Sequence, residues 1–210
     1  MCRTIAGDEQ LTFRSEATFD EVIDTGHVVQ ESVTRLTHVR RPDRLFVEAD
    51  GEQFNRHVWY DGRSLTVLDT RENRYARADA PPNIDATLDF VIREYGVHVP
   101  LADILFSNLY DVLVEQVQNG TYVGRHRVGE HLRHHLAFQQ EAIDWQVWID
   151  AGSIAVLRKL VITYKREAAA PQYVAVLYDW NLKADLSDDT FTFEPTHGAK
   201  RASMRDLIGN

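Results

Sequence analysis

The side chains best suited to chemistry in this sequence are the imidazole and guanidinium groups gathered at residues 131–135. The stretch HLRHH holds His131, Arg133, His134 and His135 just before an aromatic segment. Imidazole nitrogens bind transition metals and exchange protons near neutral pH. The cluster therefore has two interpretations: a metal or acid–base site, or a strand of a β-hairpin that carries histidines.

The period of the surrounding residues favours the strand. Successive side chains of a strand point to opposite faces, so the adjacent His134 and His135 cannot chelate one ion. One face then carries Leu132, His134, Leu136 and Phe138, and the other carries His131, Arg133, His135, Ala137 and Gln139. We expect His134 to be more buried than His135, and neither to bind a structural metal.

Other catalytic arrangements have weaker support. A metal-assisted hydrolase stays an alternative, but it needs His126, His131 and Asp144 brought together from neighbouring strands. HExxH, GxSxG and the glycine-rich phosphate motifs are absent from the sequence. The single cysteine, Cys2, excludes an internal disulfide and a multi-cysteine zinc site. We expect no catalytic residue, no metal and no cofactor.

The composition is typical of a globular protein with one sizeable core. The chain has 210 residues, of which 44% are hydrophobic and 26% charged. Its formal net charge of −9 disfavours nucleic acid as a partner, because phosphate binding needs a basic surface. We predict one domain over residues 1–210, with a core from about 11 to 199 and a polar tail at 200–210.

The beginning of the chain carries no export signal. The opening MCRTIAGDEQ lacks the apolar region of a signal peptide, and no later stretch has the length of a membrane span. Because a strand-like pattern follows almost at once, we expect a trimmed or truncated N-terminus, which is compatible with export.

The elements that must position these residues are mainly strands. Residues 11–24 alternate between apolar and polar side chains, and residues 27–39 run back after a turn, which predicts two unusually long strands. Further strands are predicted at 44–50, 56–61, 64–69, 74–78, 121–128, 131–139, 144–150, 157–165 and 172–182, with an extended piece at 190–195. Long strands joined by short turns predict a strongly curved antiparallel sheet.

Helices are predicted only near the N-terminus and within about 83–118. Asn83 can cap a helix whose apolar stripe runs to Tyr95, and Gly96 can end it. A second stripe covers residues 101–117 and is interrupted near Ser107. Strands on both sides of one helical insert predict the α+β class, with the helices covering the sheet.

Several phrases also resemble a known family. They are RRPDRLFVEA, YDGRSLTVLD, YARADAPPNIDATLDFVIREYGVHVPLADIL, HHLAFQQEAIDWQVWID, LRKLVITYK and PQYVAVLYDWN. Together they resemble a bacterial family of predicted periplasmic proteins of unknown function in the LolA/LolB-like superfamily of lipoprotein-localisation factors. The resemblance covers about residues 11–199. It implies an incomplete barrel with helices packed on its concave side, and a periplasmic location.

The resemblance also implies a function. Carriers of this fold hold lipoprotein acyl chains in an apolar cavity, and one relative is a periplasmic sensor in sigma-factor regulation. Relatives usually carry a signal peptide and a longer leading helix, which this chain lacks or has in shortened form. No catalytic residues are known for the family, so the resemblance assigns none here.

These observations predict a non-enzymatic periplasmic binding or carrier protein for a lipid-like or other apolar ligand. The expected partner is an apolar small molecule, a lipid or a lipoprotein acyl chain. An envelope sensor or protein-interaction module, in contact with the membrane or an envelope protein, is the alternative. The ligand-binding residues are predicted to be Phe13, Phe19, His134, Leu136, Phe138 and Trp145. The competing expectation is that the helices fill the apolar face completely and leave an ordinary core.

Overall fold

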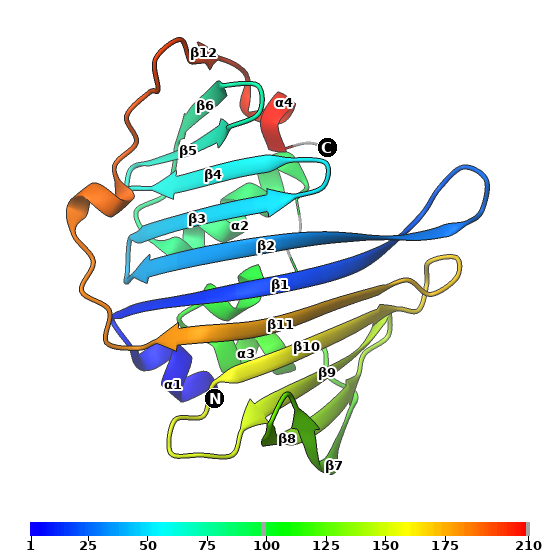
Figure 1. Cartoon of the computed structure of the whole chain (residues 1–210). Helices are drawn as coiled ribbons and strands as arrows, with labels where there is room; N and C mark the ends of the chain where they lie inside the picture. The colour runs from blue at the N-terminus through cyan, green and yellow to red at the C-terminus, as the bar shows by residue number, and fades with distance from the viewer. Residues whose placement is uncertain (98–99, 209–210) are drawn as a thin grey trace.

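A computed structural model describes residues 1–97 and 100–208, and one open sheet of twelve strands dominates this part of the chain (Figure 1). The strand order is β12-β6-β5-β4-β3-β2-β1-β11-β10-β9-β8-β7. Neighbours are antiparallel except β12 and β6, which are parallel. The strands are β1 (Gln10–Val22), β2 (Val28–Arg40), β3 (Arg44–Gly51), β4 (Asn55–Tyr60), β5 (Ser64–Asp69), β6 (Arg74–Asp79), β7 (Asn119–Val128), β8 (His131–Gln139), β9 (Ile143–Asp150), β10 (Leu157–Tyr164), β11 (Gln172–Asn181) and β12 (Lys200–Arg201).

The helices are few and short. They are α1 (Cys2–Gly7), α2 (Ile84–Tyr95), η1 (Ala102–Leu105), α3 (Leu109–Val114), η2 (Asp188–Phe191) and α4 (Met204–Ile208). Helices α2 and α3 lie on one face of the sheet, which we call the inner face (Figure 1). Among the described residues, no helix is long and apolar enough to cross a membrane. The predicted α+β fold, a curved and open antiparallel sheet with helices on one side, is confirmed.

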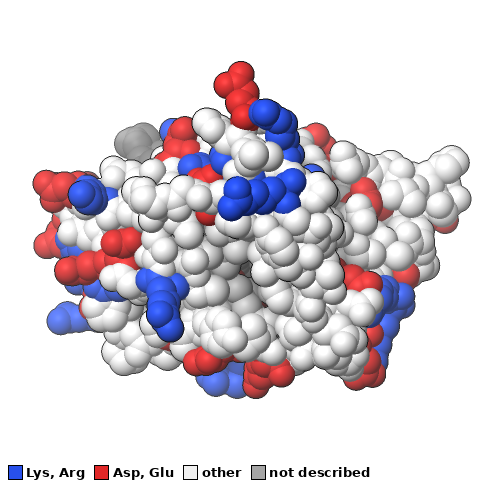
Figure 2. Space-filling view, turned by 90° about the horizontal axis from the view of Figure 1, so that it is seen from below, with Lys and Arg blue, Asp and Glu red and all other residues white. Residues whose placement is uncertain are grey.

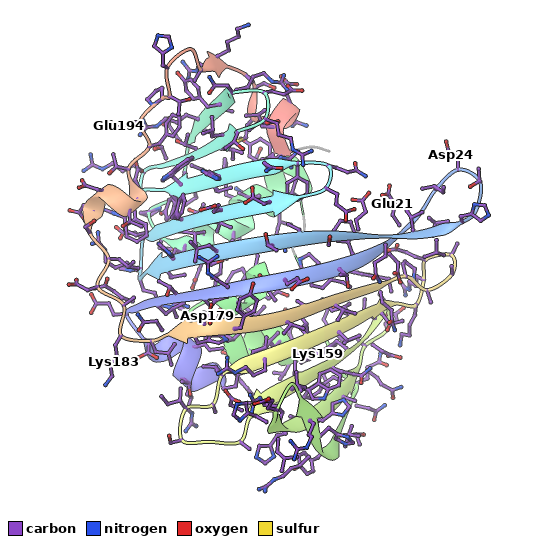
Figure 3. All side chains as sticks on the ribbon, in the orientation of Figure 1. Glu21, Asp24, Lys159, Asp179, Lys183 and Glu194 are labelled. Carbon is purple, nitrogen blue, oxygen red and sulfur yellow. The ribbon has the colours of Figure 1, made fainter. Side chains whose placement is uncertain are left out.

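The long strands β1 and β2 form the centre of the sheet because their alternation buries one face. Leu11, Phe13 and Ala17 of β1 are buried, and Leu11 and Ala17 pair with the buried Val39 and Val33 of β2. The far end of this hairpin projects beyond the neighbouring strands, where Figure 3 marks Glu21 and Asp24. There the apolar side chains are exposed: Val22, Ile23, Val28 and Val29.

The helical insert begins and ends where its sequence predicts. The Asn83 side chain accepts a hydrogen bond of 2.8 Å from the Ala86 amide, and Gly96 ends α2 with a φ of 69°. The second stripe is divided into η1 and α3, as the interruption near Ser107 predicts. The Ser107 amide donates to Asp85 of α2 at 3.0 Å, so the break is fixed by a contact between the two helical segments.

The C-terminal part differs from the prediction. Residues 190–195 form no strand: η2 ends at Phe191, and Phe193 packs between the rings of Trp59 and Tyr75. The segment expected to be a polar tail contains β12 and α4, and Met204 and Leu207 are buried. Two helical segments therefore lie outside the predicted ranges. Short segments that bury only one or two side chains carry too little periodicity to be recognised in sequence.

The prediction that His134 is more buried than His135 is wrong. His135 is 9% exposed, stacks on Trp148 at 4.0 Å and donates a 3.0 Å hydrogen bond to Gln146 Oε1. His134 is only half-buried, and on its face Leu132 stays 48% exposed. The apolar pattern identifies the inner face correctly, but the helices do not cover that face near the start of β8. Long side chains of β9 and β10 cover the outer face instead.

Replacing Leu207 with alanine should lower the free energy of unfolding by about 2–4 kcal/mol, because this side chain is 1% exposed. Urea unfolding followed by circular dichroism measures the change. Arg205→Ala, in the same helix but exposed, is the control and should cost under about 0.5 kcal/mol. Equal values for both variants would mean that α4 does not dock on the sheet.

His135→Ala should destabilise the protein more than His134→Ala. The first change removes a stacked ring and leaves the half-buried Gln146 amide without its partner, at about 1–2 kcal/mol. The second removes a half-buried ring beside the Tyr122 hydroxyl. The same urea experiment, run on both variants, compares them; a larger loss for His134→Ala would restore the burial order predicted from the sequence.

Candidate functional site

The inner face of the sheet is not completely filled by the helices. A central cavity of about 240 Å³ lies between β1–β5 and the α2–η1 segment. A lateral cavity of about 280 Å³ lies between the same helical segment and β9–β10. A broad cleft of about 870 Å³ borders it and extends along α3. The described side chains therefore leave unfilled space between the helices and this face.

The central cavity owes its apolar wall to strand alternation. Every second residue of β3, β4 and β5 points to the inner face and reaches the cavity: Leu45, Val47, Ala49, Val58, Leu65 and Val67. Leu88 and Val91 of α2 lie over this wall and border the lateral cavity as well. Helix α2 therefore separates two apolar spaces with the same pair of side chains.

Two arginines interrupt this apolar wall. Arg35 of β2 and Arg56 of β4 line the central cavity, and both are half-buried. Arg35 Nη1 lies 3.4 Å from the hydroxyl of Tyr173, whose pKa is raised by burial and lowered to a smaller extent by Arg35. Burial lowers the pKa of Arg56, against the opposite effect of Asp69. The cavity thus combines an apolar interior with positive charge.

The broad cleft has a different character. Ile143, Trp145 and Ile162 form its apolar floor, while Asp85 and Asp89 of α2 lie at its border. Seen from the β7–β8 end, the molecule is hollowed in the middle of a largely uncharged surface, with charged side chains toward its margins (Figure 2). The broad cleft therefore combines an apolar floor with acidic side chains, whereas the charged side chains of the central cavity are arginines.

The predicted binding residues are spread along the inner face rather than gathered in one site. Phe13 lines the central cavity, and Trp145 lines the broad cleft with Phe138 stacked on it at 4.1 Å. Phe19 and Leu136 pack against the core and line none of the three spaces. His134 also lies outside them, with its Nδ1 2.9 Å from the Tyr122 hydroxyl.

Sequence reasoning did not identify the two arginines, although one signal was present. On β2, Val33, Thr37 and Val39 share one face and are buried, and Arg35 stands at an alternate position of that face. An arginine on the apolar face of a strand is unusual enough to mark a site. Arg56 does not stand out in this way. Most residues of β4 are half-buried, so this strand has no clearly apolar face on which an arginine would look out of place.

The structure does not bring His126 and His131 together with Asp144. Asp144 stands opposite Gln139 at the end of β8, whereas His131 begins that strand, so the metal-hydrolase alternative has no assembled site. Among the described residues, no group of three potential ligands gathers that could hold a metal ion. His135 instead belongs to an outer-face cluster, in which Lys159, labelled in Figure 3, lies over the Trp148 ring.

Solved structures resemble this chain at low sequence identity. An uncharacterised conserved protein from Thermus thermophilus is 10% identical, with a TM-score of 0.49 over 90% of each chain. The Mycobacterium tuberculosis lipoprotein LppX is 11% identical, with a TM-score of 0.48 over 88% of this chain and 92% of that one. A LolA superfamily protein from Nitrosomonas europaea is 11% identical, with a TM-score of 0.38 over 87% and 90%.

A family model gives a more direct result. None of the curated proteins that were compared with the chain matches it. The model of a family described as "Predicted periplasmic protein (DUF2092)" matches residues 1–204, which is nearly the whole chain. This agrees with the family resemblance of the sequence phrases. The chain belongs to the DUF2092 family of predicted periplasmic proteins.

Proposed function

We propose that this protein is a non-enzymatic periplasmic binding or carrier protein for a lipid-like ligand. The central cavity is the observation that carries the proposal. It is lined mainly by apolar side chains of β1, β3, β4, β5 and α2, and the protein's own side chains leave about 240 Å³ of it unfilled. An apolar ligand chain gains about 0.8 kcal/mol for each methylene that it buries in such a space.

The neighbouring spaces extend the site. Leu88, Val91 and Ala102 line both the central and the lateral cavity, so the two spaces are adjacent. The lateral cavity and the broad cleft in turn share Ile143 and Ile162. A ligand chain that outgrows the central cavity then continues toward Trp145 and Phe138, which keeps the aromatic residues predicted from sequence in the proposed site.

Wild-type protein should bind the neutral apolar dye Nile red, with an increase in fluorescence and displacement by a lipid extract. Ala102→Trp should weaken the binding about tenfold or more, because Ala102 borders both the central and the lateral cavity and the indole would fill them. Ala151→Trp adds the same side chain in an exposed loop and is the control. Fluorescence titration gives the affinities, and circular dichroism confirms that each variant folds.

Absence of dye binding by folded wild type, or equal affinity of both tryptophan variants, contradicts the carrier function. Native mass spectrometry of gently purified protein adds an independent reading. A co-purified species with the mass of a lipid supports the proposal.

An exposed sheet edge favours a second candidate, the protein-interaction module. Strand β7 ends the sheet, is exposed over nearly its whole length and presents Tyr122 and Val123 to solvent at 57% and 45% exposure. An edge strand of this length offers the backbone groups of its outer edge to an added strand of a partner. Arg125 and Arg127 on the same strand disfavour indiscriminate pairing.

If β7 accepts a strand from another chain, its backbone amides should become protected when the partner binds. Hydrogen–deuterium exchange of a complex isolated by mild crosslinking in envelope extract measures this protection. The protection should be confined to residues 119–128, with the projecting β1–β2 hairpin as the comparison region. Protection of that hairpin in place of β7 would assign the contact to the exposed valines of its tip instead.

A further inference from the structure

Arg35 and Arg56 are brought to one place by the register of three strands. Arg35 of β2 pairs with Ala49 of β3, and Ala49 pairs with Arg56 of β4. Residues paired across neighbouring strands point to the same face, and strands are about 4.8 Å apart, so the two arginine backbones are roughly 10 Å apart. Two guanidinium groups therefore reach the central cavity on either side of a small alanine.

These two groups are the only charged residues among the described side chains that line the central cavity. The chain as a whole has a net charge of −9, so carboxylates are plentiful elsewhere. Within the described residues, neither arginine forms an ion pair: Arg35 contacts the Tyr173 hydroxyl, and Arg56 lies over the Phe54 ring at 4.9 Å. The facing Asp69 is engaged by the amides of Arg71 and Glu72 at 3.0 Å each.

One donor of this pair is buried and unused. A guanidinium group has five N–H donors, and Arg56 Nε is buried without a hydrogen-bond partner. Elsewhere in this sheet, arginines at half-buried or buried positions are paired. Arg133 and Arg158 share Asp150, with N–O distances of 2.7 and 2.6 Å. A desolvated donor without a partner is costly, so the unpaired pair in the cavity is best explained by an anion that completes it.

We propose that the ligand of the central cavity is an anionic amphiphile whose carboxylate or phosphate group is held between Arg35 and Arg56. Guanidinium forks match the planar oxygens of these anions. Both arginines are half-buried, so the head group lies where the cavity meets solvent, and its apolar chain lies under Leu88 and Val91. The small volume, near the lower limit of ligand pockets, suits one acyl chain rather than two.

This inference rests on the proposed function, and one set of titrations separates the two. Calorimetry compares dodecanoate, dodecyl phosphate and the neutral dodecanol, which share one chain. Wild type should bind the two anions about ten- to hundredfold more tightly than the alcohol, the gain expected from charge-assisted hydrogen bonds. Inorganic phosphate, added as a competitor, should displace dodecyl phosphate only weakly, because it has no chain.

Arg35→Gln combined with Arg56→Gln should remove the preference for anions, so that the variant binds dodecanoate, dodecyl phosphate and dodecanol with similar affinity. Circular dichroism shows whether the variant has folded. The double lysine variant keeps the charge and should retain most of the preference. Arg14→Gln is the matched control, since Arg14 is an exposed arginine on the opposite face of β1.

Each remaining outcome overturns a defined part. The head-group site is contradicted if wild type binds all three compounds equally. It is also contradicted if the double glutamine variant keeps the preference for anions. Neither result contradicts the carrier function. If inorganic phosphate displaces dodecyl phosphate strongly, the ligand of the arginines is free phosphate and not an amphiphile. No binding of any of the three compounds to folded wild type overturns the carrier function together with the head-group site.

Discussion

The structure depends on one mismatch, between a broad apolar face and the few helices available to cover it. Twelve strands at about 4.8 Å spacing make a surface on the order of 50 Å across, whereas α2, the longest helix, has 12 residues and is about 18 Å long. Apolar surface must be removed from water for the fold to be stable. Because the helices cannot reach the whole inner face, they leave cavities on both sides of α2 and an exposed Leu132 at the start of β8.

The two ends of the sheet differ in how their inner face is covered. At the β5–β6 end, the short helix α4 docks Met204 and Leu207 against the sheet. At the β7–β8 end, none of the described helices covers the start of β8, so the inner face keeps Leu132 exposed and the outer face packs more tightly through the His135–Trp148 stack. The histidine cluster that first suggested chemistry is thereby explained as packing at a poorly covered end of the sheet.

The sequence predicts what is determined locally. Alternation in β1, the Asn83 cap and the positive φ of Gly96 act within a few residues, and the elements that they predict are present. Which face of β8 is buried depends instead on how far a helix reaches, which no local pattern encodes. The pairing of Arg35 and Arg56 through Ala49 depends on the register of three strands. Of the two arginines, only Arg35 could be recognised from the sequence, because it is a charged residue on an otherwise apolar face of β2.

Incomplete coverage and the position of the arginines are connected. A cavity that opens to solvent at one end lets a guanidinium group stay hydrated while its aliphatic stem covers apolar wall. Arginine suits this position better than lysine, because its planar, weakly hydrated group stacks on an aromatic ring, as Arg56 does on Phe54. The fold can then accommodate the empty cavity without a large loss of stability. A ligand with both an apolar chain and an anionic group would bind through the apolar wall and through the arginines. In the function that we propose, the partly uncovered sheet leaves the space for a ligand, and Arg35 and Arg56 supply the charge that selects it.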